Sequence, residues 1–183
     1  MNNQVIKLNK VPFRFHIMHE LSRIETLEPE LPENEIRKYI SLGGFSSIGF
    51  VKFIAERAHI NHLIVSTLRV GKKQLAVLDI LKQQGKLDGV TFICGSIQVE
   101  GNNERKYNYY DNFSKVVEKN NWKVIVYNNH SKILLFDTDK GKFVVETSSN
   151  LNENPKMEQF SFEKNETLFE FYKSAFEEIE KLK

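Results

Sequence analysis

The sequence predicts an α/β fold in which strands and helices alternate around a mixed, largely parallel sheet. Short apolar segments rich in β-branched residues are typical of buried strands, and they occur at residues 62–71, 89–99 and 123–127. Segments with helical spacing of apolar residues separate them, at 72–85 and 107–120. Because strand, helix and strand in succession form a crossover between parallel strands, this order indicates helices layered on a sheet.

Composition limits the possibilities for the whole chain. Its 183 residues are 40% hydrophobic, which is enough for one domain with a substantial core. The net charge of +2 and the pI near 8.5 give no independent argument for a nucleic-acid partner, so any charge that binds phosphate must be local. The one cysteine, Cys94, lies in an apolar run and cannot form an intramolecular disulfide, so we expect a buried thiol.

No segment of the sequence indicates a membrane span or an export signal. The apolar runs are all shorter than the roughly 20 residues of a membrane helix, and the N-terminal residues lack the apolar stretch of a secretory signal. We therefore expect a protein without a membrane partner, located in the cytoplasm.

The first 45 residues, 1–45, are predicted to pack as an N-terminal segment on a core domain formed by residues 46–183. A strand and then an irregular connection interrupted by prolines are expected at its start. Residues 34–42 are predicted to form a short helix, because a Pro-Glu-Asn start and a Gly43-Gly44 stop bracket them.

Two histidines in this segment, His16 and His19, have a spacing that could suit a metal ion. No further cysteine, or set of carboxylates and histidines, completes a group of ligands around them. We therefore interpret them as ordinary histidines and predict no metal site.

Two further helices are expected. Ser46 or Ser47 is a suitable N-cap for the first, whose apolar residues keep helical spacing as far as about Ala58. Asn165 is a suitable cap for the last helix, in which one stripe contains Leu168, Phe171, Tyr172, Ala175, Phe176 and Ile179. The simplest role for that stripe is to pack on the core.

The stretch 128–159 contains the residues that point to chemistry, and it reads NNHSKILLFDTDKGKFVVETSSNLNENPKMEQ. Alternate residues of a strand share one face, so we expect His130 and Lys132 to point the same way. Leu134 and Phe136 continue that face toward the interior. The histidine and the lysine therefore lie together at the start of a buried strand.

A hairpin is expected to follow this strand. Asp137 is predicted to begin a polar, glycine-containing turn, after which residues 142–145 return as a second apolar strand. The returning strand delivers the polar residues 146–150 beyond its end, and so brings them back near the histidine.

Six residues of this stretch form a motif: His130, Lys132, Asp137, Ser148, Asn150 and Glu158. Their order and spacing resemble the HKD signature of the phospholipase D superfamily, and most closely the small nucleases that carry a single motif. In that family a Gly-Ser pair closely follows the aspartate. Here Thr147-Ser148 stands in that position, after a longer turn.

The resemblance implies a phospholipase D-like α/β/α sandwich and a metal-independent phosphodiesterase that needs no cofactor and cleaves DNA through a phosphohistidine intermediate. His130 would be the nucleophile, Lys132 would neutralise charge, and Glu158 would fix the tautomer of the histidine. The family's other roles would be phosphate binding by Lys132, Ser148 and Asn150, and a structural role for Asp137.

The single motif also implies a homodimer. A histidine that attacks phosphorus cannot at the same moment protonate the leaving oxygen, so a second histidine is needed. Two copies of His130 would meet across a twofold axis in one shared cleft, one as nucleophile and the other as general acid.

Other interpretations remain open from the sequence. The principal alternative is a non-enzymatic module of the same fold that binds nucleic acid or a protein partner, and phospholipid hydrolysis ranks third. Arg69, Lys72 and Lys73 follow one predicted strand, and they either extend a phosphate-binding rim or are the solvated start of a helix.

Overall fold

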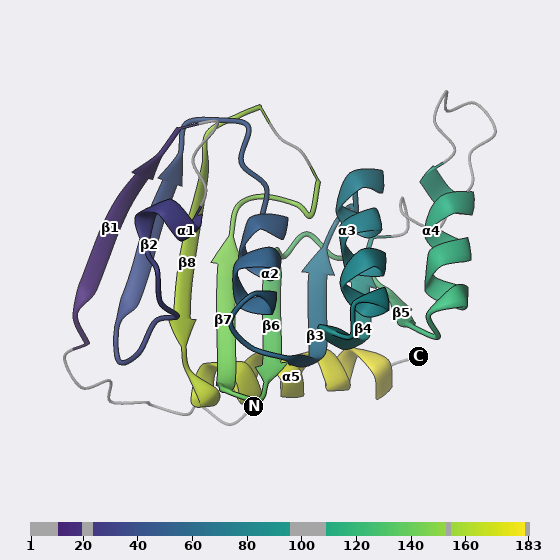
Figure 1. The fold of residues 1–183 in the computed structure, drawn as a ribbon. Helices are drawn as coiled ribbons and strands as arrows, with labels where there is room; N and C mark the ends of the chain where they lie inside the picture. The colour runs from purple at the N-terminus through teal and green to yellow at the C-terminus, as the bar shows by residue number, and fades with distance from the viewer. Residues whose placement is uncertain (1–10, 20–23, 96–108, 153–154, 182–183) are drawn as a thin grey trace.

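The computed structural model describes residues 11–19, 24–95, 109–152 and 155–181. The described residues form a sheet of eight strands with helices on both of its faces (Figure 1). The strands are β1 (Phe13–Met18), β2 (Ile36–Ser41), β3 (Ile60–Thr67), β4 (Leu87–Cys94), β5 (Lys123–Val126), β6 (Ile133–Thr138), β7 (Gly141–Thr147) and β8 (Glu158–Lys164). The helices are α1 (Ile24–Leu27), α2 (Ile48–Ala55), α3 (Lys72–Gln83), α4 (Tyr109–Lys119) and α5 (Glu166–Lys181).

The predicted α/β class with a mixed sheet is confirmed. The strand order is β1-β2-β8-β7-β6-β3-β4-β5. Parallel pairing joins β1 to β2, and it joins β3 to β4 and β4 to β5. The parallel share is smaller than predicted, because the β6–β7 hairpin and β8 enter between these groups as antiparallel neighbours. The last part of the predicted strand 89–99 and the start of the predicted helix 107–120 lie outside the described residues.

Apolar side chains cover both faces of the sheet. On one face, α2, α3 and α4 enclose a large cluster that includes Phe50, Phe92 and Phe162. On the other face, α5 covers a smaller cluster that includes Leu135. Cys94 is fully buried at the end of β4, as predicted. Because the central strands are buried on both faces, their sequences are nearly continuous apolar runs.

The predicted helix at residues 34–42 is wrong, because this segment is the strand β2. Its burial alternates with the period of a strand, and Arg37, Tyr39 and Ser41 face the interior. Asn34 does not cap a helix; it takes a positive φ of 55° in the turn that leads into β2. Gly43 then ends the strand with φ 137°, where a Cβ would lie 2.6 Å from the carbonyl oxygen of Pro155. The helix prediction rested on end signals that also suit a strand between two turns.

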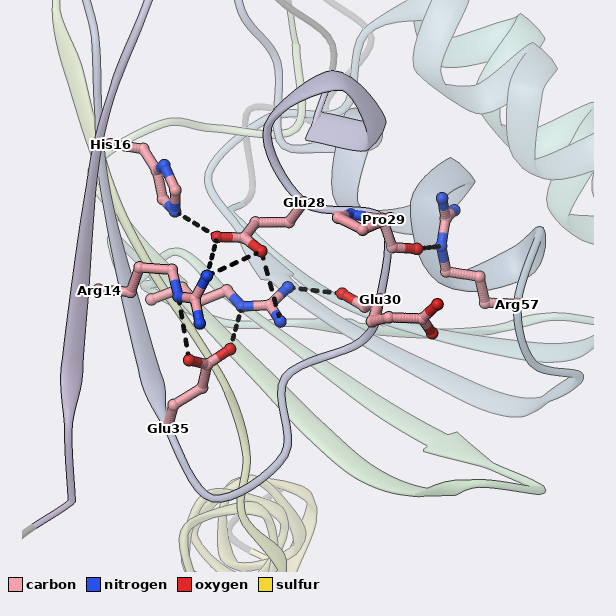
Figure 2. Close-up of polar contacts among 8 residues, drawn as sticks. Arg14, His16, Glu28, Pro29, Glu30, Glu35 and Arg57 are labelled. Atoms are coloured by element: carbon pink, nitrogen blue, oxygen red, sulfur yellow. Dashed lines mark hydrogen bonds and ion pairs between the residues drawn. The ribbon is translucent and has the colours of Figure 1, made fainter.

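An ion network joins β1 and β2 to the connection between them (Figure 2). The Glu28 carboxylate lies 2.9 Å from Nε2 of His16 and 3.2 Å from Nη1 of Arg14. Glu35 accepts hydrogen bonds from Nε of Arg14 at 3.1 Å and from Nε of Arg37 at 2.7 Å. Arg37 is almost fully buried and also donates to a backbone carbonyl of the connection. The network therefore fixes the connection against one face of the first two strands.

Two helices differ in detail from their predicted form. Ser47 is the N-cap of α2 but its side chain makes no cap hydrogen bond, and α2 ends at Ala55 rather than near Ala58. Asn165 does cap α5, since its Oδ1 accepts a hydrogen bond from the backbone N–H of Leu168 at 3.0 Å.

The buried stripe of α5 is rotated from the predicted one. Phe169 and Phe176 are buried, whereas Phe171 and Ala175 are exposed. Three members of the predicted stripe, Leu168, Tyr172 and Ile179, pack on the cluster as partly buried residues. The helix therefore presents a neighbouring set of positions to the sheet.

Candidate active site

Most of the motif residues lie at one end of the strands, the upper end of the sheet in Figure 1. The register shows this, because Ser66 near the end of β3 pairs with Ile133 at the start of β6, and Ile133 pairs with Glu146 near the end of β7. His130 and Lys132 precede β6, Ser148 and Asn150 follow β7, and Glu158 begins β8. In α/β sheets, ligands bind beyond the carboxyl ends of strands, and β3, β4, β5 and β7 all end here.

His130 and Lys132 contact each other just before β6. His130 is exposed, and Nζ of Lys132 lies 3.1 Å from its Nδ1 and 2.5 Å from its backbone oxygen. Burial lowers the pKa of Lys132, while the negative charge of Glu158 opposes that shift. The ammonium group therefore contacts the imidazole and is close enough to Glu158 to interact electrostatically with its carboxylate.

A buried polar cluster holds the histidine segment in place. Nδ2 of Asn129 donates to the Ser66 hydroxyl at 2.9 Å and to the Ile93 carbonyl at 2.8 Å, so it ties the segment to β3 and β4. Its Oδ1 accepts hydrogen bonds from the backbone N–H of Ser131 at 2.9 Å and from its hydroxyl at 2.7 Å. Asn129 and Ser131 flank His130, so this cluster fixes the backbone from which the imidazole projects.

Thr67, which follows Ser66 in β3, holds the Asn150 segment. Thr67 Oγ1 donates to Oδ1 of Asn150 at 3.3 Å and accepts a hydrogen bond from the N–H of Leu151 at 3.1 Å. The N–H of Leu68 also donates to Oδ1 of Asn150, at 3.2 Å. Because these bonds occupy the amide oxygen, the NH₂ group is the end of Asn150 that can donate to a substrate.

Ser148 and Glu158 form a second pair, between the ends of β7 and β8. The Ser148 hydroxyl donates to the Glu158 carboxylate and accepts a hydrogen bond from the N–H of Gln159 at 3.1 Å. The N–H of Ser148 donates to the carbonyl of Gln159, also at 3.1 Å. Glu158 is buried, so the serine holds its carboxylate in a fixed position.

Asp137 does not join this cluster. It lies inside β6 opposite Lys142, near the far end of the strand. The prediction that Asp137 begins the turn is wrong, because β6 continues through Thr138 and the chain reverses at residues 139–140. The Thr138 hydroxyl donates to the carbonyl of Gly141 at 2.7 Å and so closes the turn in its place.

Three supporting residues, Ser66, Thr67 and Asn129, were not predicted. The signal that could have found the first two is a pair of hydroxyl residues at the end of the otherwise apolar run that forms β3. Such residues at the carboxyl end of a central strand are placed to bind neighbouring loops. Arg69 follows β3, and Lys72 and Lys73 begin α3, at the same end of the strands.

The described part of the chain contains neither a cluster of metal-binding side chains nor a helix that could span a membrane. No group of three or more His, Cys, Asp or Glu side chains there is arranged to hold a metal ion. No helix formed by those residues is long and apolar enough to span a membrane.

Comparisons with known proteins give likeness in structure only. No family model matches the sequence, and no curated protein matches it. Polyphosphate kinase from Porphyromonas gingivalis superposes with a TM-score of 0.65 at 12% identity, over 87% of this chain and 29% of that chain. At that identity the likeness shows the fold alone, a phospholipase D-like α/β fold.

Two further structures superpose less well. Yeast tyrosyl-DNA phosphodiesterase has a TM-score of 0.37 at 14% identity, over 67% of this chain and 28% of that chain. The archaeal chromatin protein TrmBL2 has a TM-score of 0.47 at 11% identity, over 77% of this chain and 50% of that chain. These two scores support no inference. The chain spans half or less of the length of each of the three proteins.

Proposed function

We propose that this chain is a metal-independent phosphodiesterase of the phospholipase D type that hydrolyses DNA as a homodimer. The observation that carries the proposal is that an exposed imidazole, a partly buried ammonium group and a buried carboxylate lie together at one end of the strands. They belong to His130, Lys132 and Glu158. These residues follow the order of the HKD motif, and the fold in which they converge is phospholipase D-like.

The site contains the groups that phosphodiester cleavage needs. The negative charge of the diester repels nucleophiles, so a cation must neutralise a nonbridging oxygen, and Lys132 provides one. The NH₂ group of Asn150 can donate a hydrogen bond to a second oxygen. The Ser148 hydroxyl donates a hydrogen bond to Glu158, and it contacts the phosphate once that hydrogen bond is exchanged.

The nucleophile in this proposal is Nε2 of His130, which needs a free electron pair. Nζ of Lys132 lies 3.1 Å from Nδ1, and a protonated lysine that donates there leaves the ring proton on Nε2. A bound phosphate attracts the ammonium group away, so the ring proton can then reside on Nδ1. Attack forms the phosphorus–nitrogen bond and expels the alkoxide, which takes a proton from the histidine of the second copy. Water then cleaves that bond and restores the imidazole.

The experiment that tests this proposal is an incubation of the purified protein with single- and double-stranded DNA in EDTA. We expect cleavage by a dimer, with a transient phosphohistidine adduct detected by intact-protein mass spectrometry after rapid quenching. Activity that depends on an added divalent metal would contradict the mechanism. A folded dimer that binds DNA but does not cleave it would favour the second candidate.

That second candidate is a non-enzymatic module of the same fold that binds nucleic acid or a protein. The Lys132–His130 contact favours this second candidate, because the tautomer that it stabilises carries the ring proton on Nε2 and cannot attack phosphorus through that atom. In this case His130→Ala leaves function unchanged, whereas neutralising Lys132, Lys72 and Lys73 weakens DNA binding and reduces its dependence on salt.

The pH profile of kcat/KM is expected to show an alkaline limb below pH 10.5, since burial lowers the pKa of Lys132 from its ordinary value of 10.5. The protonated lysine neutralises the phosphate, so activity is present below the lowered pKa and is lost as pH rises through it. Lys132→Arg should remove this limb, because a guanidinium group stays charged. An unchanged limb in that variant would assign the titration to another group.

Replacing Asn129 by alanine is expected to lower kcat by about 10²-fold with little change in KM, since the imidazole loses its fixed position. A matched control is Asn120→Ala. The Asn120 amide bridges Asp79 and the Val116 carbonyl between α3 and α4, at 2.8 and 2.9 Å, away from the motif. Steady-state kinetics should separate the two variants. Equal losses of kcat would show that Asn129 acts through general stability alone.

A further inference from the structure

Among the described residues, β1 is the outermost strand on one side of the sheet. Within the described residues its partner in the sheet is β2, and the strand order begins with β1 (Figure 1). An edge strand presents a row of backbone N–H and C=O groups that can pair with another strand, and natural sheets usually protect such edges with charges, proline or a covering element.

The backbone of β1 shows which residues face this edge. The carbonyls of Pro12 and Met18 accept hydrogen bonds from residues 36 and 42 on the β2 side, so the even-numbered residues of β1 point their backbone groups at β2. The N–H and C=O groups alternate in direction along a strand. The odd-numbered residues Phe13, Phe15 and Ile17 therefore direct theirs at the open edge.

The same odd-numbered residues carry exposed apolar side chains. Phe13, Phe15 and Ile17 are 55%, 74% and 67% exposed. They lie on the sheet face that also carries α5, because the even-numbered residues face the interior with Arg37 and Tyr39. Figure 1 shows α5 crossing behind the middle of the sheet, away from β1. The stripe is therefore apolar, open and continuous with the edge.

The charges on the other face of β1 are already neutralised. Arg14 is paired with Glu28 and Glu35, and His16 with Glu28, as Figure 2 shows. A second β1 strand can therefore approach this edge without bringing an uncompensated charge next to another. Cross-strand like charges would otherwise oppose pairing.

We propose that β1 pairs antiparallel with β1 of a second copy of this chain, about a twofold axis through Phe15. In this register Phe15 lies opposite its own copy, and Phe13 lies opposite Ile17. Each of the three residues whose backbone groups face the edge then lies opposite another of the three. Their apolar side chains therefore pack against one another on one face of the joined sheet. The alternation Phe-x-Phe-x-Ile is self-complementary in this way, which is why the occupant is a second copy.

This interface is separate from the shared cleft of the proposed function and does not depend on it. Four strand spacings of about 4.8 Å separate β1 from β6, so the edge lies roughly 19 Å along the sheet from the histidine segment. Pairing through β1 leaves two copies of His130 roughly 40 Å apart. The two interfaces can therefore be tested independently.

Disulfide cross-linking tests the register. In the proposed pair, Phe15→Cys places two cysteines at a Cα separation of about 5.5 Å, which a disulfide spans. Phe13→Cys alone places them about 14 Å apart, which a disulfide does not span. Under mild oxidation we expect at least about tenfold more cross-linked dimer for Phe15→Cys than for Phe13→Cys.

Mixing Phe13→Cys with Ile17→Cys should restore the cross-link, because these positions are opposite each other. The chain without a new cysteine is the control, since Cys94 is fully buried. Equal cross-linking of all single variants, or none for Phe15→Cys, would overturn the register and the proposal with it.

Sedimentation velocity provides a second measurement. Phe15→Lys is expected to remove association through β1 and so to lower the weight-average mass by at least about half, to that of the dimer formed at the shared cleft or, without that dimer, to that of one chain. Phe171→Lys is the matched control, because Phe171 is 58% exposed on α5 and lies outside β1. Mass that is unchanged in Phe15→Lys, or an equal fall in both variants, would contradict pairing through β1. Failure of the proposed function would show instead as absent cleavage in EDTA, with cross-linking unaffected.

Discussion

Replacing His130 by alanine is expected to lower DNA cleavage at least about 10⁴-fold, because the covalent step loses its nucleophile and the protonation step loses its acid. Folding and association should be unchanged, since His130 is exposed and precedes β6. Single-turnover cleavage in EDTA measures the loss. His59→Ala is the matched control. This histidine is paired with Asp88 at the opposite end of the strands, so its removal should leave cleavage intact.

The same variant tests whether two histidines share a cleft. When His130→Ala subunits are exchanged with unaltered ones in equal amounts, a shared site leaves activity in only about one quarter of the dimers. Independent sites would retain about half of the activity. An activity that falls linearly with the fraction of altered subunits would therefore exclude the shared cleft, even if His130 itself proves essential.

Replacing Arg37 by alanine is expected to lower the free energy of unfolding by about 3–5 kcal/mol, the usual cost of leaving a buried charge without its partner. Arg37 and Glu28 have side chains that are 4% and 6% exposed, and Arg37 also holds Glu35 at 2.7 Å. Removal of the guanidinium group leaves these carboxylates without their buried cation. Urea unfolding should show a midpoint lowered by about 2 M, for a slope of about 2 kcal/mol per molar.

Arg14→Ala is the control for that prediction. Arg14 contacts the same two carboxylates, but its side chain is 54% exposed, so solvent can replace it. We expect a clearly smaller loss of stability. A loss as large as that of Arg37→Ala would show that the whole network, rather than burial of one arginine, determines the stability of the first two strands.

Local pattern was sufficient to predict the central part of the fold. Burial between adjacent elements requires the apolar runs of β3, β4 and β5. It also requires the helical spacing of Leu75, Leu78 and Leu81 in α3. The strand β2 was mistaken for a helix because the signals at its two ends suit either element, and its alternating burial was not evident since the buried face contains Arg37. An arginine reads as a surface residue until Glu28 and Glu35 approach it, and only the tertiary fold brings them there.

The motif was predictable from its order in the sequence, but its support was not. His130, Lys132 and Ser148 lie at the ends of one hairpin, so local geometry was enough to predict that they would lie near one another. Glu158 begins the next strand, β8, and was included only through the resemblance in sequence order. Ser66 and Thr67 belong to a much earlier strand. They reach Asn129 and Asn150 only because β3 pairs with β6, and that pairing depends on the order of the whole sheet.

The position of β8 between β2 and β7 has a consequence for synthesis of the chain. β2 is made early, yet its inner neighbour β8 comes near the C-terminal end, so most of the chain separates the two. At ordinary elongation rates the ribosome takes on the order of ten seconds to make the intervening residues. During that interval β1 and β2 are not yet joined to the rest of the sheet, because β8 is the strand that links them to β7. Among the described strands, β8 is thus the one that unites the two parts of the sheet.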